Sequence, residues 1–379
     1  MKRFLITLHR WLGYPLGIIF AVTILTGILS GIDDLLDMLG VPNAPAVVIS
    51  DREMGLALDT LTARHSDARQ VLLPSENEPV FTVVLRGERY FYAASDLSLL
   101  GHEQSSRDGF FPVMLRLHRN LLMGREGIAG LSGAEWVAWV GLISLALSLL
   151  GIYLWWPHKR TFKLKRLVPT NNKQSSFYFS HLTAGIVTVA FVVLFALTGA
   201  AITYRSVAQS LLLPTQQQSA VATPVYAAGG WGAAISTARQ VFVDSELTSV
   251  SMNAGRRTPA HYAQAAQFRF HTPDDWFGLA GSTVYIHKQT VAYLGHQAFS
   301  DYTSGQQLYE LILPLHTGRG LTPAYLIIML AAMSLTFIMM VAGLTSFVRK
   351  KSKLEKKINQ HTAAHFKKLT DGLSQATSK

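Results

Sequence analysis

The sequence predicts an α-helical membrane protein with four transmembrane helices, arranged as two tandem repeats, and a small α+β domain outside the membrane in each repeat. Three observations support this fold class: long apolar blocks, a one-sided distribution of basic residues, and motifs that occur twice in the same order. The chain has 379 residues, a net charge of +11 and no cysteine. Without cysteine, disulfides, thiolate iron–sulfur clusters, c-type haem attachment and a cysteine nucleophile are excluded.

Four apolar blocks are long enough to span a membrane, which takes about 20 helical residues. None has an acidic or basic residue in its middle, and they run Trp11–Ile32, Trp136–Trp156, Phe179–Tyr204 and Ala324–Val348. The first block follows a basic start, as in a signal peptide. It is longer than a signal h-region, however, and no small-x-small cleavage motif ends it, so we expect a retained helix.

Basic residues concentrate in three segments: the N-terminus, the loop after the second block, and the tail. Together these segments contain 18 Lys and Arg but two acidic residues, whereas the two long loops contain 16 basic and 21 acidic residues. Positively charged segments stay in the cytoplasm, so we expect both termini there, in a bacterial inner membrane. The basic charge then reflects topology and attraction to anionic membrane lipids, and no nucleic-acid-binding module is expected.

This topology divides the chain into eight parts. The membrane helices are 1–32 with a cytoplasmic N-terminus, 132–156, 179–204 and 323–348; the periplasmic domains are 33–131 and 205–322; the cytoplasmic segments are the loop 157–178 and the tail 349–379. Periodicity predicts domain helices at Ala63–Val71 and Ala233–Val243, and strands at Val80–Leu85, Arg89–Ala93, Gln267–Phe270 and Thr283–His287. The composition of Ser206–Gly230, rich in Gln, Ala, Ser and Pro, indicates a linker or mobile loop.

Several motifs occur twice, which predicts a duplicated chain. The first and third helices each begin with a histidine, have a glycine four residues later, and have a Thr-Gly pair whose glycine is 18 residues after the histidine. Each long loop contains Leu-Gly-His and ends in a leucine-flanked histidine. The repeated residues are His9 and His181, Gly13 and Gly185, Gly27 and Gly199, His102 and His296, and His118 and His316. The halves, about 1–156 and 177–348, should be related by an axis along the membrane normal.

Four of these histidines predict two cofactor sites. Under this symmetry, His9 and His181 face each other near one membrane surface, and His118 and His316 near the other. Residues four apart share a helix face, and 18 residues make five turns, so the glycines leave flat gaps beside the histidines at two depths. They are Gly13, Gly185, Gly27 and Gly199. Two imidazoles on either side of a planar ring are typical of haem ligation, and two haems would carry electrons across the bilayer.

Other interpretations of these residues stay open. Histidines at helix ends are often ordinary interfacial residues, glycines often permit close helix packing, and a haem could instead join histidines within one half. Three arginines near the expected sites could pair with haem propionates or be ordinary flanking charges: Arg10, Arg119 and Arg319.

Further polar residues carry weaker hypotheses. His102 and His296 repeat, but they lie in strand-like segments, so a ligand or substrate role is a minor alternative. The remaining candidates are expected to be solvated or to form an exposed turn: His158, His361 and His365, and then Asp274, Asp275 and Trp276.

Several motifs together resemble the PepSY-associated transmembrane family over nearly the whole chain. They are the opening Leu8-His9-Arg10-Trp11-Leu12-Gly13, outer units ending near Gly101 and Gly295, Leu-x-x-His at His118 and His316, and Gly151-Ile-Tyr-Leu-Trp-Trp-Pro157. Known members include iron-regulated inner-membrane proteins and haem-containing ferric-siderophore reductases. The resemblance therefore implies PepSY-like outer domains, haem b held by the four histidines, and reduction of a periplasmic iron(III) chelate. One departure is the turn Ile286–Val291, which lacks the acidic or Thr-Gly segment usual in the family.

The leading functional hypothesis is a di-haem reductase that moves electrons across the membrane to a periplasmic ferric siderophore and releases iron(II). Because the chain has no Gly-rich dinucleotide motif or flavin motif, a quinol or a cytoplasmic reductase must supply the electrons. The alternative is a non-redox PepSY-type membrane protein that binds or regulates a peptide or protease partner. A transporter is less favoured, because its ion pathway would place ionisable residues inside the helices.

Overall fold

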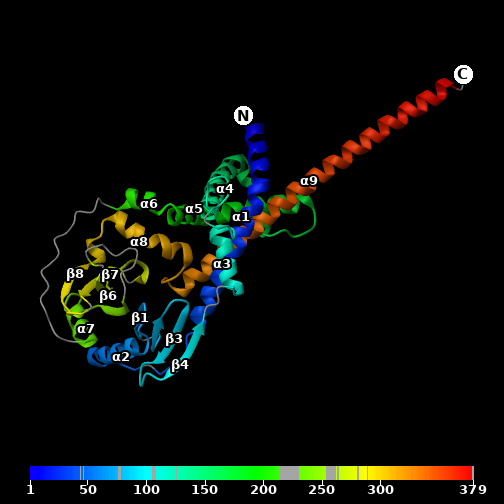
Figure 1. The fold of residues 1–379 in the computed structure, drawn as a ribbon. Helices are drawn as coiled ribbons and strands as arrows, with labels where there is room; N and C mark the ends of the chain where they lie inside the picture. The colour runs from blue at the N-terminus through cyan, green and yellow to red at the C-terminus, as the bar shows by residue number, and fades with distance from the viewer. Residues whose placement is uncertain are drawn as a thin grey trace. The chain divides into compact units, whose positions relative to one another are not determined.

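The computed structural model describes residues 1–42, 44–45, 47–75, 78–104, 108–124, 126–213, 230–252, 262, 264–279, 281–287 and 289–377. The chain divides into two compact units (Figure 1). The first, here called the helical unit, contains Met1–Leu29, Leu115–Thr203 and Ile328–Lys379. The second, here called the sheet unit, contains Ser30–Met114 and Tyr204–Ile327.

Four helices are long and apolar enough to cross a membrane, as the sequence predicts: α1 (Lys2–Leu39), α4 (Gly133–Trp155), α5 (Gln174–Thr203) and α9 (Pro323–Thr377). The helical unit also contains most of α3 (Phe110–Asn120), and two short 3-10 turns after α4, η1 (Trp156–Thr161) and η2 (Leu164–Arg166). Two boundaries differ from the prediction. Helix α1 begins at Lys2, so His9 lies inside the helix rather than at its end, and α9 continues far beyond Val348.

Helix α4 begins three residues before the predicted block because of a capping box. The Ser132 side chain accepts a hydrogen bond from the backbone N–H of Glu135, and the Glu135 carboxylate accepts one from the Ser132 N–H. This reciprocal pair satisfies two backbone donors at the start of the helix. A polar Ser-x-x-Glu motif therefore sets the boundary, not the first apolar residue.

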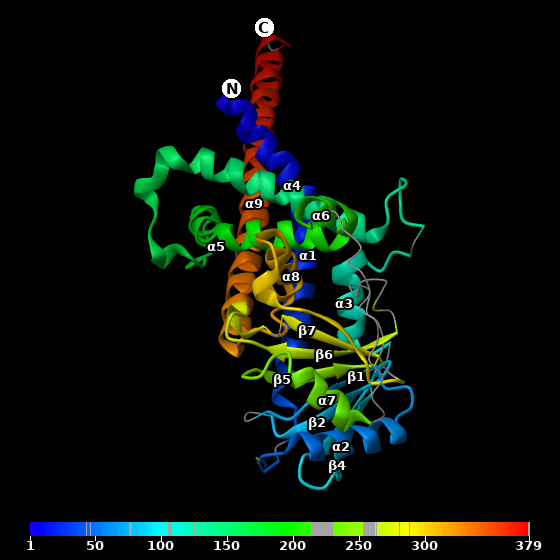
Figure 2. The ribbon, with the colours of Figure 1, turned by 90° about the vertical axis from the view of Figure 1, so that its left-hand side faces the viewer.

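Helices α4 and α5 form a hairpin, and the two ribbon views show this pair running across α1 and α9 (Figure 2). Helices α1 and α9 touch along their apolar sides, where the ring of Phe347 lies 5.8 Å from that of Trp11 and 4.8 Å from that of Tyr14. The expected symmetry axis along a membrane normal stays a prediction.

The sheet unit contains one antiparallel sheet of eight strands, in the order β4-β3-β2-β1-β5-β6-β7-β8. The strands are β1 (Gln70–Leu72), β2 (Val80–Val84), β3 (Glu88–Ala93), β4 (Leu99–Gln104), β5 (Glu246–Ser251), β6 (Ala265–His271), β7 (Ser282–His287) and β8 (Tyr293–Gln297). The strands expected from alternation are all present. The sequence predicts two separate domains, but β1 and β5 pair with each other, with Val71 opposite Val250, and join both sets of strands into one sheet.

The two sets of four strands share their local geometry. Gly101 pairs with Phe91 in the β3–β4 ladder, and Gly295 pairs with Tyr285 in the β7–β8 ladder. In both ladders the register shifts directly after that residue, which is a β-bulge in the same place. The two Leu-Gly-His motifs therefore occupy matching strand positions.

Two helices cover one face of the sheet, α2 (Asp51–Arg64) and α7 (Trp231–Arg239). The predicted helix at Ala63–Val71 is wrong, because α2 ends at Arg64 and the chain then turns into β1. A capping box between Ser50 and Glu53 starts α2 early, and Leu58 and Leu61, three residues apart, put their side chains in the core. The helix expected at Ala233–Val243 is α7, shifted slightly towards the N-terminus.

The predicted linker at Ser206–Gly230 begins with a helix, α6 (Arg205–Leu212). Most of the remaining linker, residues 214–229, lies outside the described residues. A further helix, α8 (Ser304–Thr317), carries His316. It is capped by Gly318, whose φ of 78° lies in the left-handed region that favours glycine.

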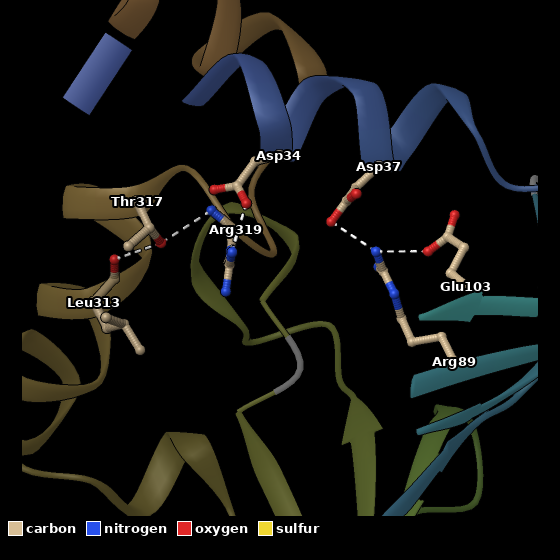
Figure 3. A network of polar contacts seen from close by, with 7 residues as sticks. All are labelled: Asp34, Asp37, Arg89, Glu103, Leu313, Thr317 and Arg319. Atoms are coloured by element: carbon tan, nitrogen blue, oxygen red, sulfur yellow. Dashed lines mark hydrogen bonds and ion pairs between the residues drawn. The ribbon is translucent and has the colours of Figure 1, made fainter. Parts of the chain in front are cut away.

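Two sets of ion pairs hold the C-terminal end of α1 within the sheet unit (Figure 3). Asp34 accepts hydrogen bonds from Nη2 and Nε of Arg319 at 2.6 and 2.9 Å. One turn further along, Asp37 lies 2.7 Å from Nη2 of Arg89, which also contacts Glu103 of β4 at 2.8 Å. The end of α1 is thus tied both to the segment after α8 and to the sheet.

Helices α2 and α7 approach most closely at two glycines, which gives a test of their packing. A Cβ atom at Gly55 would lie 2.3 Å from Cα of Gly232, whereas a Cβ atom at Gly232 would lie 4.0 Å from Cα of Gly55. We expect Gly55→Ala to force the helices apart and destabilise the sheet unit by about 1–3 kcal/mol. Thermal unfolding followed by tryptophan fluorescence measures the effect. Gly232→Ala is the matched control, and equal melting temperatures for both variants would contradict this packing.

Candidate functional site

The structure brings the rings of His9 of α1 and His181 of α5 close together within the helical unit. Their ring centroids are 6.2 Å apart, and the ring planes are inclined by 59°. The two side chains come from helices that are far apart in the sequence. Two imidazoles in this position are an arrangement that can hold one metal ion between them.

His181 is held in a fixed orientation by the backbone of α9. Its Nδ1 lies 3.0 Å from the carbonyl oxygen of Met339, and a proton on Nδ1 is donated to that oxygen. The ring also packs against Gly343, where a Cβ atom would lie 2.6 Å from Nδ1. A backbone hydrogen bond at Nδ1 leaves Nε2 as the ligand atom, which is the usual arrangement of metal-binding histidines.

His9 has a different environment. Its Nδ1 is buried and has no hydrogen-bond partner among the described residues. Its Cε1 lies 3.4 Å from the position of a Cβ atom at Gly151 of α4. The ring also lies within hydrogen-bonding reach of the backbone of Leu147 on α4. Buried polar atoms without a partner are rare in proteins, and a metal bond at Nδ1 itself would explain this one.

All four long helices therefore meet at the histidine pair. Helices α1 and α5 supply the imidazoles, and α4 and α9 each supply a glycine that one imidazole packs against, Gly151 for His9 and Gly343 for His181. Sequence reasoning missed this role for Gly151 and Gly343. Both glycines stand near the ends of apolar blocks, but their contacts with another helix leave no signal in the sequence.

The glycines predicted to leave gaps beside the histidines differ in their surroundings. No atom lies within 4 Å of a Cβ atom built at Gly13, so the helix surface there is open, and a cofactor gap beside His9 stays a prediction. Gly185 instead faces α9, with Sδ of Met339 at 3.3 Å. Gly199 is partly buried on α5.

His118 on α3 lies against α1 at Thr23 and Gly27. Its Nδ1 is 2.8 Å from the carbonyl oxygen of Thr23, and its ring packs on Gly27, where a Cβ atom would lie 2.9 Å from Cε1. The structure thus brings His118 and Gly27 together. Burial lowers the pKa of His118, which favours the neutral imidazole that a metal ligand must be.

The expected partner of His118 lies in the other compact unit. His316 is partly buried on α8 of the sheet unit. Each unit is defined by itself, so the pairing of His118 with His316 stays a prediction.

One comparison with known proteins decides the family. The family model described as PepSY-associated TM region matches residues 6–350. The chain belongs to the PepSY-associated transmembrane family. No curated protein matches it. The matched residues of this PepSY family member include His9, His118, His181 and His316, the four histidines of the two expected sites.

The donor set at His9 and His181 fits a haem. Imidazoles bound on opposite sides of one metal ion at about 2 Å have ring centroids about 6 Å apart, close to the observed 6.2 Å. Among the described residues of this PepSY protein, no group of three or more His, Cys, Asp or Glu side chains is placed to hold a metal ion. A porphyrin supplies the four remaining nitrogens, so a haem needs two protein ligands and not three or four.

Of the three arginines considered for haem propionates, Arg319 pairs with Asp34. Arg119 is exposed on α3, and Arg10 is partly buried on α1. The charge of Arg319 therefore has a carboxylate partner within the PepSY protein itself.

The other candidates take part in local contacts of the sheet unit. His102 stacks on Tyr90 at 4.1 Å, and His296 lies 2.5 Å from the hydroxyl of Tyr293. Asp275 accepts a hydrogen bond from the N–H of Thr272 in the turn before Trp276. His158 is exposed in η1, and the side chains of His361 and His365 lie outside the described ones. Lys288, in the turn Ile286–Val291 that differs from the usual family pattern, also lies outside the described residues.

Proposed function

We propose that this PepSY family member is a di-haem reductase of a bacterial inner membrane that carries electrons across the membrane to a periplasmic ferric siderophore. The observation that carries the proposal is the facing pair His9 and His181, with ring centroids 6.2 Å apart and helices α1, α4, α5 and α9 around it.

The residues of the chain would hold and tune haem b. His9 and His181 would supply the imidazole ligands, and the hydrogen bond from Nδ1 of His181 to the carbonyl oxygen of Met339 would fix one ring and make it a better donor. When bound, haem iron takes up and releases one electron at a time. His9 and His181 are both partly buried among the four long helices, and solvent exposure is one of the factors that would set the potential of a haem held there.

The second haem site is proposed at His118 and His316. Support comes from the orientation of His118, whose Nδ1 is hydrogen-bonded to a backbone carbonyl oxygen as in His181. The repeated motifs and the matching β-bulges of the sheet also favour a chain built from two tandem halves. In that arrangement the second pair would serve the opposite membrane surface.

The substrate class rests on the resemblance of the sequence to the PepSY-associated transmembrane family, whose known members include haem-containing ferric-siderophore reductases. Siderophores hold iron(III) far more tightly than iron(II), so a single electron delivered to the bound iron releases it. The electron donor would be a quinol or a cytoplasmic reductase.

Optical spectroscopy of the purified full-length protein tests the proposal. We expect a reduced-minus-oxidised spectrum of a six-coordinate b-type haem and two haems per chain. Correctly folded protein without bound haem would refute the redox function and favour the alternative, a PepSY-type membrane protein that binds or regulates a peptide or protease partner.

The proposed topology is tested by single cysteines, which are clean probes because the chain has none. Ser352 on α9 and Ser95 in the sheet unit are both exposed. In intact spheroplasts, a membrane-impermeant maleimide should label Ser95→Cys and should label Ser352→Cys only after the membrane is opened. The opposite labelling pattern would invert the topology.

A further inference from the structure

A concentrated basic surface lies beside the His9–His181 pair in the helical unit. It is formed by the loop 157–173, which includes η1 and η2, and by the adjoining residues 349–351 of α9, and we call it the basic loop surface. These segments contain no Asp or Glu and nine cationic residues: Lys159, Arg160, Lys163, Lys165, Arg166, Lys173, Arg349, Lys350 and Lys351.

Two arginines of this surface are held in place by aromatic rings. The guanidinium carbon of Arg166 lies 4.2 Å from the ring centroid of Phe179, and its Nη1 donates to the carbonyl oxygen of Thr161. The guanidinium carbon of Arg349 lies 4.6 Å from the ring of Phe177. Its Nη1 donates to a loop carbonyl oxygen, that of Asn172. Neither arginine pairs with a carboxylate in the part of the chain that the structure describes.

These contacts place the positive charge next to a proposed haem ligand. Phe177 and Phe179 belong to the first turns of α5, directly before His181. The hydroxyl of Ser180 also donates a hydrogen bond of 2.8 Å to the carbonyl oxygen of Leu167, which ties the loop to the residue that precedes His181. A second bond, of 3.0 Å, joins Gln174 to Ser346 of α9.

A preference for positive charge on the cytoplasmic side explains why the loop is basic, but it requires no fixed geometry. Here the loop is anchored by hydrogen bonds, Arg166 and Arg349 are oriented by rings, and Lys163 and Lys165 of the same loop are exposed. A fixed positive surface without acidic residues attracts an acidic protein and orients it on approach. A quinol headgroup is uncharged and approaches through the bilayer, so it gains nothing from this surface.

We propose that the basic loop surface is the docking site of an acidic, soluble one-electron carrier protein, a flavoprotein or an iron–sulfur protein, which reduces the haem at His9 and His181. The inference rests on the proposed redox function and selects one of its two possible donors. In the step, the carrier loses one electron and haem iron(III) becomes iron(II), with no bond formed or broken. The anchored segment from Leu167 to Ser180 brings the docked carrier close to His181.

Stopped-flow reduction of the haem-loaded full-length protein tests this proposal. The protein is placed in nanodiscs of neutral lipid and mixed with a reduced flavodoxin, which is strongly acidic, or with decylubiquinol. The test variant is Lys163→Glu with Lys165→Glu, since both side chains are exposed on the basic loop surface. The matched control is Arg52→Glu with Arg86→Glu, which changes the net charge equally on exposed positions of the sheet unit.

We expect the test variant to lower the flavodoxin rate roughly tenfold or more and to flatten its salt dependence. The control variant and the decylubiquinol rate should stay unchanged. A haem-loaded protein that flavodoxin reduces at the same rate in both variants would overturn the docking proposal and leave the redox function standing. The docking proposal also fails if the test variant only loses binding of phosphatidylglycerol in anionic nanodiscs, which would make a lipid headgroup the occupant. Protein without haem would instead refute the proposed function, and this inference with it.

Discussion

Replacing either His9 or His181 with alanine is expected to reduce the haem content from two per chain to one. The two imidazole rings lie 6.2 Å apart, and a haem that both would hold would be bound only weakly by one of them alone. The measurement is a pyridine haemochrome assay of the purified variants, together with the reduced-minus-oxidised spectrum. Electron transfer from one membrane surface to the other should be lost in both variants.

The matched control for this prediction is His158→Ala. His158 is also a histidine of the helical unit, but it is exposed in η1, and its loss should leave both haems. Two haems in His9→Ala and in His181→Ala would show that this pair is not the ligand set. The double variant should resemble the single variants, because in the proposed arrangement both side chains would hold the same haem.

The substitution Gly343→Ala, which adds a single methyl group, is expected to remove the haem proposed at His9 and His181. A Cβ atom there would lie 2.6 Å from Nδ1 and 3.0 Å from Cε1 of His181. The imidazole would have to move away and would lose its hydrogen bond to the carbonyl oxygen of Met339. Gly343→Ala keeps both histidines, so a loss of haem in this variant would report on the position of the His181 ring alone. The haemochrome assay measures the haem content, and a shift in reduction potential would report on any haem that remains.

Gly185→Ala is the control for this methyl group. Its Cβ atom would meet Sδ of Met339 at 3.3 Å, and an unbranched methionine side chain adapts easily. Both glycines lie in long apolar helices, where alanine has the higher helix propensity. Normal haem content in both variants would argue that His181 has room to move and that its position is not set by Gly343.

The sequence predicts the membrane helices well because the signal for them is composition, which is local. Each span is identified by apolar length alone, and the strands of the sheet unit by their alternation. The apolar block Trp136–Trp156 begins after α4 does, and the helix expected at Ala63–Val71 begins where α2 ends, because polar Ser-x-x-Glu motifs at Ser132 and Ser50 set the starts of these helices. Both capping boxes are visible in the sequence, so these two boundaries are predictable from polar motifs rather than from apolar ones.

The residues of the candidate site can also be predicted from the sequence only in part. Repetition selects His9 and His181, because duplicated positions can be compared within one chain. The contacts of Gly151 and Gly343 with these rings could not be predicted, because they depend on how one helix packs on another. The pairing of β1 with β5 is also non-local, and nothing in either short strand indicates its partner.

The β1–β5 pairing also imposes an order on biosynthesis. Strand β1 is made early, but residues 249–251, its partners, leave the ribosome only after α4 and α5 have been synthesised. Until then the first four strands have an uncovered edge, where free backbone N–H and C=O groups can recruit other chains. The nascent first half is therefore the stage at which this protein depends most on assistance from chaperones, and a chain truncated after α5 should aggregate or be degraded.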